Sequence, residues 1–138
     1  MSSVYVAKAT ANGGRNGKVQ SSDGVLNLEV RIPKEMGGPG GAYSNPEQLF
    51  AAGYAACFDS ALQFVARNQK VTLKNTTVTA EVGIGPNSSG GFQLAVKLQA
   101  HIEGPDRDEA KKLLEAAHQV CPYSNATRGN IEVSLELI

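Results

Sequence analysis

A long apolar segment in the first half of the chain constrains the fold most. Residues 47–67 contain no proline and a single glycine, Gly53. Asn45 can cap a helix and Pro46 suits its first position, so the segment predicts a helix over residues 47–67. Because the segment is apolar on nearly every side through Phe58, we expect it to be buried almost all round. A chain of 138 residues has little material for that, so a partner subunit should help to cover the helix.

Alternating apolar and polar residues predict strands around this helix, near residues 4–10, 18–22, 26–32, 78–84, 92–102 and 131–137. A second helix should begin after Gly104-Pro105, where Asp106 and Glu109 are spaced as in a capping box. It should end at Cys121-Pro122, because the residue before a proline is pushed out of the helical region. Strands separated by two helices indicate an α+β fold with an antiparallel-rich sheet, in one domain over residues 1–138.

Charge and composition exclude several classes of function. The 13 basic and 13 acidic residues balance, which argues against a nucleic-acid binder. The longest uncharged apolar stretch, residues 48–58, is shorter than the roughly 18 residues that a membrane span needs. The N-terminus lacks the pattern of a signal peptide. We therefore expect a cytoplasmic protein that binds neither nucleic acid nor membrane.

Cys57 lies deep inside the predicted helix, where a cysteine can be a small packing residue or a reactive thiol. It lies about 16 Å from the helix N-terminus, by the rise per residue. The helix dipole acts only over the first turn, so a reactive Cys57 needs a cation from another element. Arg15, in the turn "NGGRNG", is a candidate, although an exposed turn arginine without a role is the commoner case.

Glu47 and Cys121 are open to two interpretations each. Glu47 lies in the first turn of the helix, where it complements the dipole, but it could also orient an arginine through a two-point contact. Cys121 could be a core residue at the end of the second helix. It could also be a second thiol, to which the expected turn over residues 122–125 leaves some freedom. In a reducing cytoplasm a disulfide is usually transient and catalytic.

The two histidines raise the question of a metal site. His101 falls on the polar side of its strand and should face solvent, while His118 lies beside the apolar stripe of the second helix. Two cysteines are too few for a zinc site without histidine ligands, so we expect no metal. The glycine-rich residues 37–41 lack the Gly-Lys-Ser/Thr sequence of a phosphate-binding loop.

Three segments of the chain resemble the organic hydroperoxide resistance proteins, a branch of the OsmC/Ohr family. They are "GGRNGKVQSSDGVLNLEV", "PKEMGGPGGAYSNPEQLFAAGYAACF" and "CPYSNATRGNIEVSLEL", in family order over essentially the whole chain. The resemblance implies an OsmC/Ohr-like α+β fold with sheets packed around a long central helix, in an intertwined homodimer. It implies a thiol-dependent peroxidase for organic hydroperoxides, without haem, flavin or metal, reduced by lipoylated proteins or other dithiols.

The resemblance also assigns roles to residues. Cys57 matches the peroxidatic cysteine and Cys121 the resolving cysteine, while Arg15 matches the arginine that stabilises the thiolate and Glu47 the glutamate that holds it. From composition, the apolar wall of the substrate pocket is expected to contain Met36, Phe50, Tyr54, Phe58 and Tyr123.

Two other functions remain open from the sequence. The chain could be a carrier of apolar ligands whose cysteines only pack in the core. It could also be a redox sensor that forms the same disulfide without turnover, although no DNA-binding element is visible in the sequence.

Overall fold

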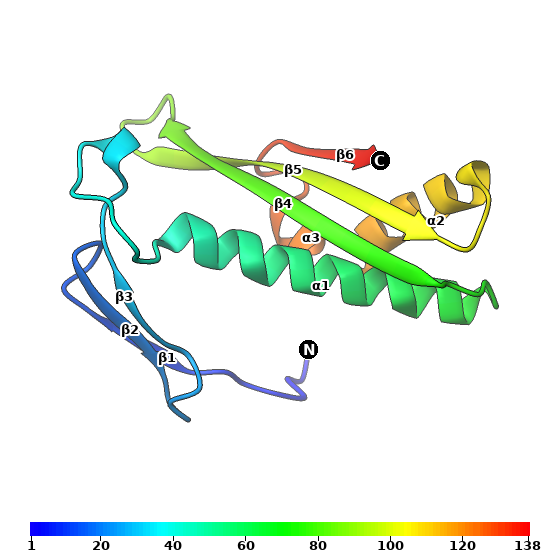
Figure 1. Ribbon diagram of the computed structural model, residues 1–138, viewed down its shortest axis with the longest axis horizontal. Helices are drawn as coiled ribbons and strands as arrows, with labels where there is room; N and C mark the ends of the chain where they lie inside the picture. The colour runs from blue at the N-terminus through cyan, green and yellow to red at the C-terminus, as the bar shows by residue number, and fades with distance from the viewer. The chain divides into compact units, whose positions relative to one another are not determined.

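The computed structural model describes all residues from Met1 to Ile138. The chain forms two compact units, Met1–Leu49 and Phe50–Ile138. The expected α+β class is confirmed: each unit contains a three-stranded sheet, and a long helix begins at the end of the first unit (Figure 1). The single domain expected over residues 1–138 stays a prediction.

The first unit is built on an antiparallel meander of β1 (Ala9–Asn12), β2 (Gly17–Ser21) and β3 (Asn27–Val30). The turn between β1 and β2 needs glycine, because Gly13 and Gly14 have φ angles of +85° and +58°. The strand expected over residues 4–10 was placed too early, since pairing with β2 begins only at Ala9. A short 3₁₀ helix, η1 (Lys34–Met36), follows β3.

The sheet of the second unit has the order β4-β5-β6, with bounds Asn75–Pro86, Phe92–Glu103 and Val133–Leu137. β4 and β5 form a long antiparallel hairpin (Figure 1), whose turn is closed by Asn87 Oδ1 accepting from the backbone N–H groups of Ser89 and Gly91. β6 pairs parallel to β5. His101 on β5 is half exposed and hydrogen-bonds Glu103, in agreement with the predicted solvent-facing position.

The helices begin where their capping residues predict. Asn45 Oδ1 accepts from Gln48 N–H at 2.8 Å at the start of α1 (Pro46–Asn68). Asp106 Oδ1 accepts from Glu109 N–H at 2.9 Å at the start of α2 (Arg107–Val120). α2 stops before Cys121-Pro122 as expected. The residues after it were wrongly expected to be only a turn: they form a third helix, α3 (Pro122–Thr127), with Pro122 at its first position.

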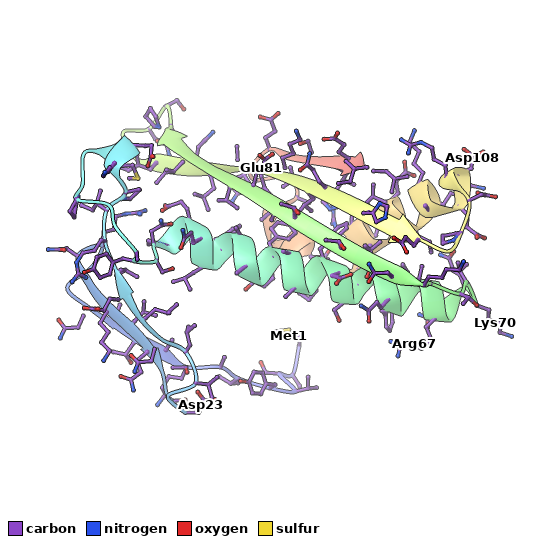
Figure 2. All side chains as sticks on the ribbon, viewed as in Figure 1. Met1, Asp23, Arg67, Lys70, Glu81 and Asp108 are labelled. Atoms are coloured by element: carbon purple, nitrogen blue, oxygen red, sulfur yellow. The ribbon has the colours of Figure 1, made fainter.

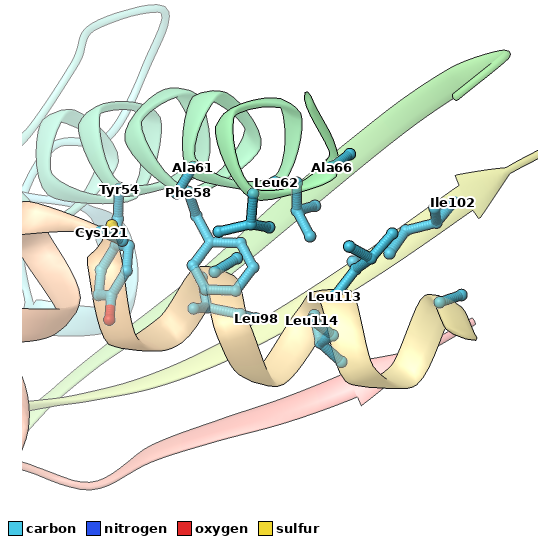
Figure 3. Packing of buried hydrophobic residues seen from close by; sticks show 14 of the residues in the cluster. Tyr54, Phe58, Ala61, Leu62, Ala66, Leu98, Ile102, Leu113, Leu114 and Cys121 are labelled. Atoms are coloured by element: carbon cyan, nitrogen blue, oxygen red, sulfur yellow. The ribbon is translucent and has the colours of Figure 1, made fainter. Parts of the chain in front are cut away.

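One hydrophobic cluster holds the second unit together. It combines one face of α1, the inner face of β5 and the apolar stripe of α2 (Figure 3). Burying each large side chain of this kind contributes roughly 1.5–3 kcal/mol. The fully buried members with the largest side chains are Tyr54, Phe58, Leu62, Leu98, Leu113 and Cys121. Figure 3 shows Tyr54 and Cys121 at the same end of this cluster, so Cys121 is a core residue whatever its chemistry.

The other face of α1 is open in the single chain. Ala52, Ala56 and Phe64 are exposed, so the chain alone does not bury this helix on every side. By length and composition alone, α1 could cross a membrane. A core helix passes the same test, and the inner face of α1 packs in the cluster of the second unit. The partner subunit expected to cover the open face stays a prediction.

Charged side chains lie outside this cluster. Arg67 and Lys70, near the end of α1, and Asp108, in the first turn of α2, extend away from the ribbon in Figure 2. All three residues are exposed. On the sheet, Lys97 of β5 lies between Glu81 and Glu136, at 3.8 and 3.3 Å, and all three side chains are about half exposed. The buried side chains of the second unit are mainly apolar, and the buried polar residues are Ser124 and Thr127.

Candidate functional site: two thiols and an ion pair

The two cysteines of the chain meet in the second unit. Cys57, in the middle of α1, and Cys121, between α2 and α3, are 64 positions apart in the sequence. Their sulfur atoms lie 3.5 Å apart and both thiols are free, with Cys121 Sγ–H donating to Cys57 Sγ. Cys121 is fully buried and Cys57 partly buried. A disulfide needs about 2.05 Å between the sulfurs, so a shift of roughly 1.5 Å would join them.

The surroundings of Cys57 in the second unit do not favour its thiolate. Burial raises the pKa of Cys57 above its ordinary value, because the charged form loses its water. The backbone N–H of Tyr123 acts in the opposite direction as a hydrogen-bond donor to the sulfur, and the neighbouring Cys121 raises the pKa further. The rise outweighs the one favourable donor, so a thiolate at Cys57 would need an additional positive group.

The first unit contains a charged pair with a two-point contact. Arg15, in the β1–β2 turn, donates from both terminal nitrogens to the carboxylate of Glu47, in the first turn of α1. The two N–O distances are 2.8 and 2.6 Å, the two-point contact of a guanidinium with a carboxylate. The Arg15 hydrogen bonds lower the pKa of Glu47, and those same bonds raise the pKa of Arg15. Both groups are therefore charged at neutral pH.

The structure thus brings together two of the predicted pairs: Cys57 with Cys121, and Arg15 with Glu47. Each pair lies within one unit. The catalytic roles expected for these four residues stay predictions.

The predicted pocket residues fall into three groups. Phe50 and Tyr123 line a cavity of about 680 Å³ in the second unit, which also has Phe92 and Ile131 in its wall. The Tyr54 ring packs edge-on against Phe50 and at a tilt against Tyr123, with centroid distances of 6.2 and 5.6 Å.

Tyr54 is nevertheless completely buried, as is Phe58, so both serve as core residues in this structure. Met36 is exposed on η1 in the first unit. Their part in a substrate pocket stays a prediction.

Gly53 has a role that the sequence did not indicate. A Cβ atom at this position would lie 2.5 Å from Tyr123 Oη and 3.1 Å from Cζ of the same ring. Glycine therefore lets the Tyr123 ring pack directly on α1, which compensates for its cost of about 1 kcal/mol in a helix. Pro122 was the signal for the missed helix: proline favours the first position of a helix, and here it starts the element that carries Tyr123.

No group of three or more His, Cys, Asp or Glu side chains in the structure could hold a metal ion. His118, considered above as a possible ligand, instead places Nδ1 2.8 Å from Ser124 Oγ.

The chain is similar to known proteins over nearly its whole length. Residues 38–136 match the family model described as OsmC-like protein. An organic hydroperoxide resistance protein of Xanthomonas axonopodis pv. citri is 51% identical over 135 residues, covering 97% of this chain and 94% of that protein. The organic hydroperoxide resistance protein OhrB of Bacillus subtilis is 46% identical over 137 residues, covering 97% of this chain and 98% of that protein.

Among solved structures, an organic hydroperoxide resistance protein from Elizabethkingia anophelis, crystallised with thiocyanate bound, superposes with a TM-score of 0.95. It is 59% identical in sequence, and the match covers 99% of this chain and 98% of that chain. The chain therefore belongs to the OsmC-like protein family, in its organic hydroperoxide resistance branch.

Proposed function

We propose that this protein is a thiol-dependent peroxidase that reduces organic hydroperoxides to alcohols and protects against oxidative stress. The observation that supports the proposal most directly is the 3.5 Å separation of the Cys57 and Cys121 sulfurs, two free thiols that are distant in sequence. Relatives that match nearly the whole chain are named for organic hydroperoxide resistance, which supports the substrate class.

The first chemical step is the oxidation of Cys57. Its thiolate attacks the distal peroxide oxygen, the O–O bond breaks, and the alkoxide leaves and takes a proton to become the alcohol. Cys57 is left as a sulfenic acid. The apolar residues Phe50 and Tyr123, which line the cavity of the second unit, suit the organic part of such a substrate. Met36, Tyr54 and Phe58 remain proposed as further wall residues.

The second step is resolution by Cys121. Its sulfur attacks the sulfenic sulfur of Cys57, a disulfide forms, and the hydroxyl leaves as water with the thiol proton. Burial of Cys121 beside Cys57 makes this partner available without unfolding of the helix that carries Cys57. A dithiol then reduces the disulfide by exchange. We propose a lipoylated protein as that dithiol and the cytoplasm as the site of action.

The activation of Cys57 is assigned to the ion pair. Arg15 would stabilise the thiolate and Glu47 would hold the guanidinium in one orientation. Two findings support this assignment: the second unit raises the pKa of Cys57, and the Arg15–Glu47 contact has the rigid two-point geometry of an orienting pair. A homodimer is also proposed, because the open face of α1 exposes Phe64 and two alanines.

Stopped-flow consumption of cumene hydroperoxide by the reduced protein tests the function. Wild type should consume one equivalent rapidly and Cys57→Ser should consume none. Cys121→Ser should react once and then accumulate sulfinic acid on Cys57, seen by mass spectrometry as added oxygen. If wild type and Cys57→Ser react equally slowly, the protein is no peroxidase and a carrier of apolar ligands becomes the better explanation.

A further inference from the structure

A chain of buried hydrogen bonds ties the three helices of the second unit together. Tyr54 Oη, from α1, lies 2.8 Å from Ser124 Oγ and 3.1 Å from Thr127 Oγ1, both on α3. His118 Nδ1, from α2, lies 2.8 Å from Ser124 Oγ. Tyr54 and Ser124 are 0% exposed and Thr127 is 5% exposed.

These hydroxyl groups stand at the edge of the apolar cluster. Every buried side-chain nitrogen and oxygen of the chain has a partner, so the network is fully satisfied. A satisfied hydrogen bond adds little net stability compared with apolar groups of the same shape, because the unfolded chain makes equivalent bonds to water. Its distinctive effect is directional: the position of α3 relative to α1 and α2 is fixed by bonds of defined length, which apolar packing alone would not impose.

The network lies next to both sulfurs along the chain. Tyr54 precedes Cys57 by three residues on α1, just under one helical turn. Ser124 follows Cys121 by three residues, and Cys121 is the residue that caps α3. The bond between Tyr54 and Ser124 therefore connects the two backbone segments that carry the thiols, at a point separate from the sulfurs themselves.

We propose that Ser124, with Tyr54 and Thr127, positions Cys121 for the resolving step. The inference rests on the proposed function, because it concerns the fate of the Cys57 sulfenic acid. That species either condenses with Cys121, releasing water, or meets a second hydroperoxide, which transfers an oxygen to give the sulfinic acid and leaves as alcohol. Holding Cys121 at 3.5 Å favours the first outcome, since a loosened α3 would spend more time with the sulfurs apart.

The measurement is the partition of oxidised Cys57 between disulfide and sulfinic acid, determined by mass spectrometry after turnover at a fixed excess of cumene hydroperoxide. This ratio is independent of how fast the first oxidation occurs. Ser124→Ala should raise the proportion of sulfinic acid by about fivefold, the factor that corresponds to one net hydrogen bond. Thr127→Val, which keeps the shape and removes the hydroxyl, should change it in the same direction.

Ile102→Val is the matched control. It removes one methylene from the same cluster, at a cost in stability comparable to that of the hydroxyl variants, but lies on β5 and makes none of the network's bonds. It should keep the wild-type partition.

The proposal is overturned if Ser124→Ala and Thr127→Val both keep the wild-type partition, or if Ile102→Val raises sulfinic acid as much as they do. Failure of the proposed function has a different signature, because wild type itself would then form no disulfide with hydroperoxide.

Discussion

The ion pair of the first unit and the thiol pair of the second are built in opposite ways. Arg15 keeps a third of its side chain exposed, on a turn closed by two glycines with positive φ, and it interacts through charge. Cys121 is fully enclosed in the hydrophobic cluster, and the helix that follows it is bonded to α1 through buried hydroxyls. A charge can act from a solvent-facing turn because its field extends over several ångströms. Thiols that must bond to each other need fixed contact.

In the proposed reaction, the first unit activates Cys57 and the second unit resolves the sulfenic acid. The second unit brings the sulfurs together but raises the pKa of Cys57, the thiol that we propose reacts with peroxide. The first unit contains a permanently charged guanidinium with a carboxylate that orients it. Variants of the ion pair should therefore change the ionisation of Cys57, and variants of the thiol surroundings should change packing or the fate of the sulfenic acid.

Arg15→Ala should have the largest effect. Without the guanidinium, burial and the neighbouring Cys121 leave the pKa of Cys57 above its ordinary value, so most of the thiol stays protonated at pH 7. The rate of peroxide consumption at pH 7 should therefore fall by at least about tenfold. The measurement is the rate of Cys57 alkylation by iodoacetamide against pH, in the Cys121→Ser background so that one thiol is followed.

Arg15→Lys is the control for that variant, since it keeps the charge and loses the planar two-point contact. It should fall between wild type and Arg15→Ala. An alkylation profile that is the same for Arg15→Ala and wild type would remove Arg15 from the mechanism.

Glu47→Gln should have a smaller effect, because the charge that acts on the thiolate remains while its orientation loosens. We expect a reduction of a few fold in peroxide consumption, short of the Arg15→Ala loss. The stability effect depends on pH. The folded pKa of Glu47 is lowered by Arg15, so the pair stabilises the fold above the unfolded pKa of the carboxyl, near 4.5, and this contribution is lost as pH falls through the lowered value.

The difference in unfolding free energy between wild type and Glu47→Gln should therefore be present at pH 7 and disappear at strongly acidic pH. At pH 7 it should be below about 1 kcal/mol, since Arg15 is a third exposed and solvent screens the pair. Urea titrations at both pH values measure it. A difference that grows as pH falls would contradict the stabilising role of the ion pair.

The capping residues and the strand alternation show which features of the fold local sequence patterns can predict. Asn45 and Asp106 were predictable because a cap bonds an N–H three residues away, so the interaction is local. The β4–β5 hairpin was predictable because alternation and a glycine-rich turn lie next to each other in the chain. The strand expected over residues 4–10 was misplaced because the pairing of β1 is decided by β2.

What depends on distant contacts could not be obtained from local patterns. Nothing in the pattern of residues 131–137 shows that β6 lies parallel to β5. The residues alone left Cys57 open between packing and chemistry, and its pairing with Cys121 came from family resemblance. The buried contact of Tyr54 with Ser124, 70 positions apart, and the close approach of Tyr123 to Gly53 depend on how three helices meet.

Gly53→Ala tests how the Tyr123 ring packs on α1 in the second unit. The added methyl would clash with the Tyr123 ring, which must move away and lose aromatic contacts worth about 0.5–1.5 kcal/mol. Alanine returns about 1 kcal/mol of helix propensity, so the net change in unfolding free energy should be small. The near-ultraviolet circular dichroism of tyrosine should change nonetheless. In Gly83→Ala, the control, the new Cβ comes no closer than 4.0 Å to its neighbours, so the tyrosine signal should stay as in wild type.

Lys97→Ala should have the smallest effect. It tests whether a positive charge other than Arg15 changes the ionisation of Cys57. Lys97 lies between Glu81 and Glu136 on the sheet of the second unit, and all three side chains are about half exposed. Pairs of this kind contribute about 0.2–1 kcal/mol at most, and salt screens them. Peroxide consumption and the alkylation profile of Cys57 should be indistinguishable from wild type, and the loss of stability should shrink further in 1 M salt. If Lys97→Ala shifted the thiol pKa as Arg15→Ala does, the ionisation of Cys57 would follow the net charge of the protein. Arg15 would then have no specific role in it.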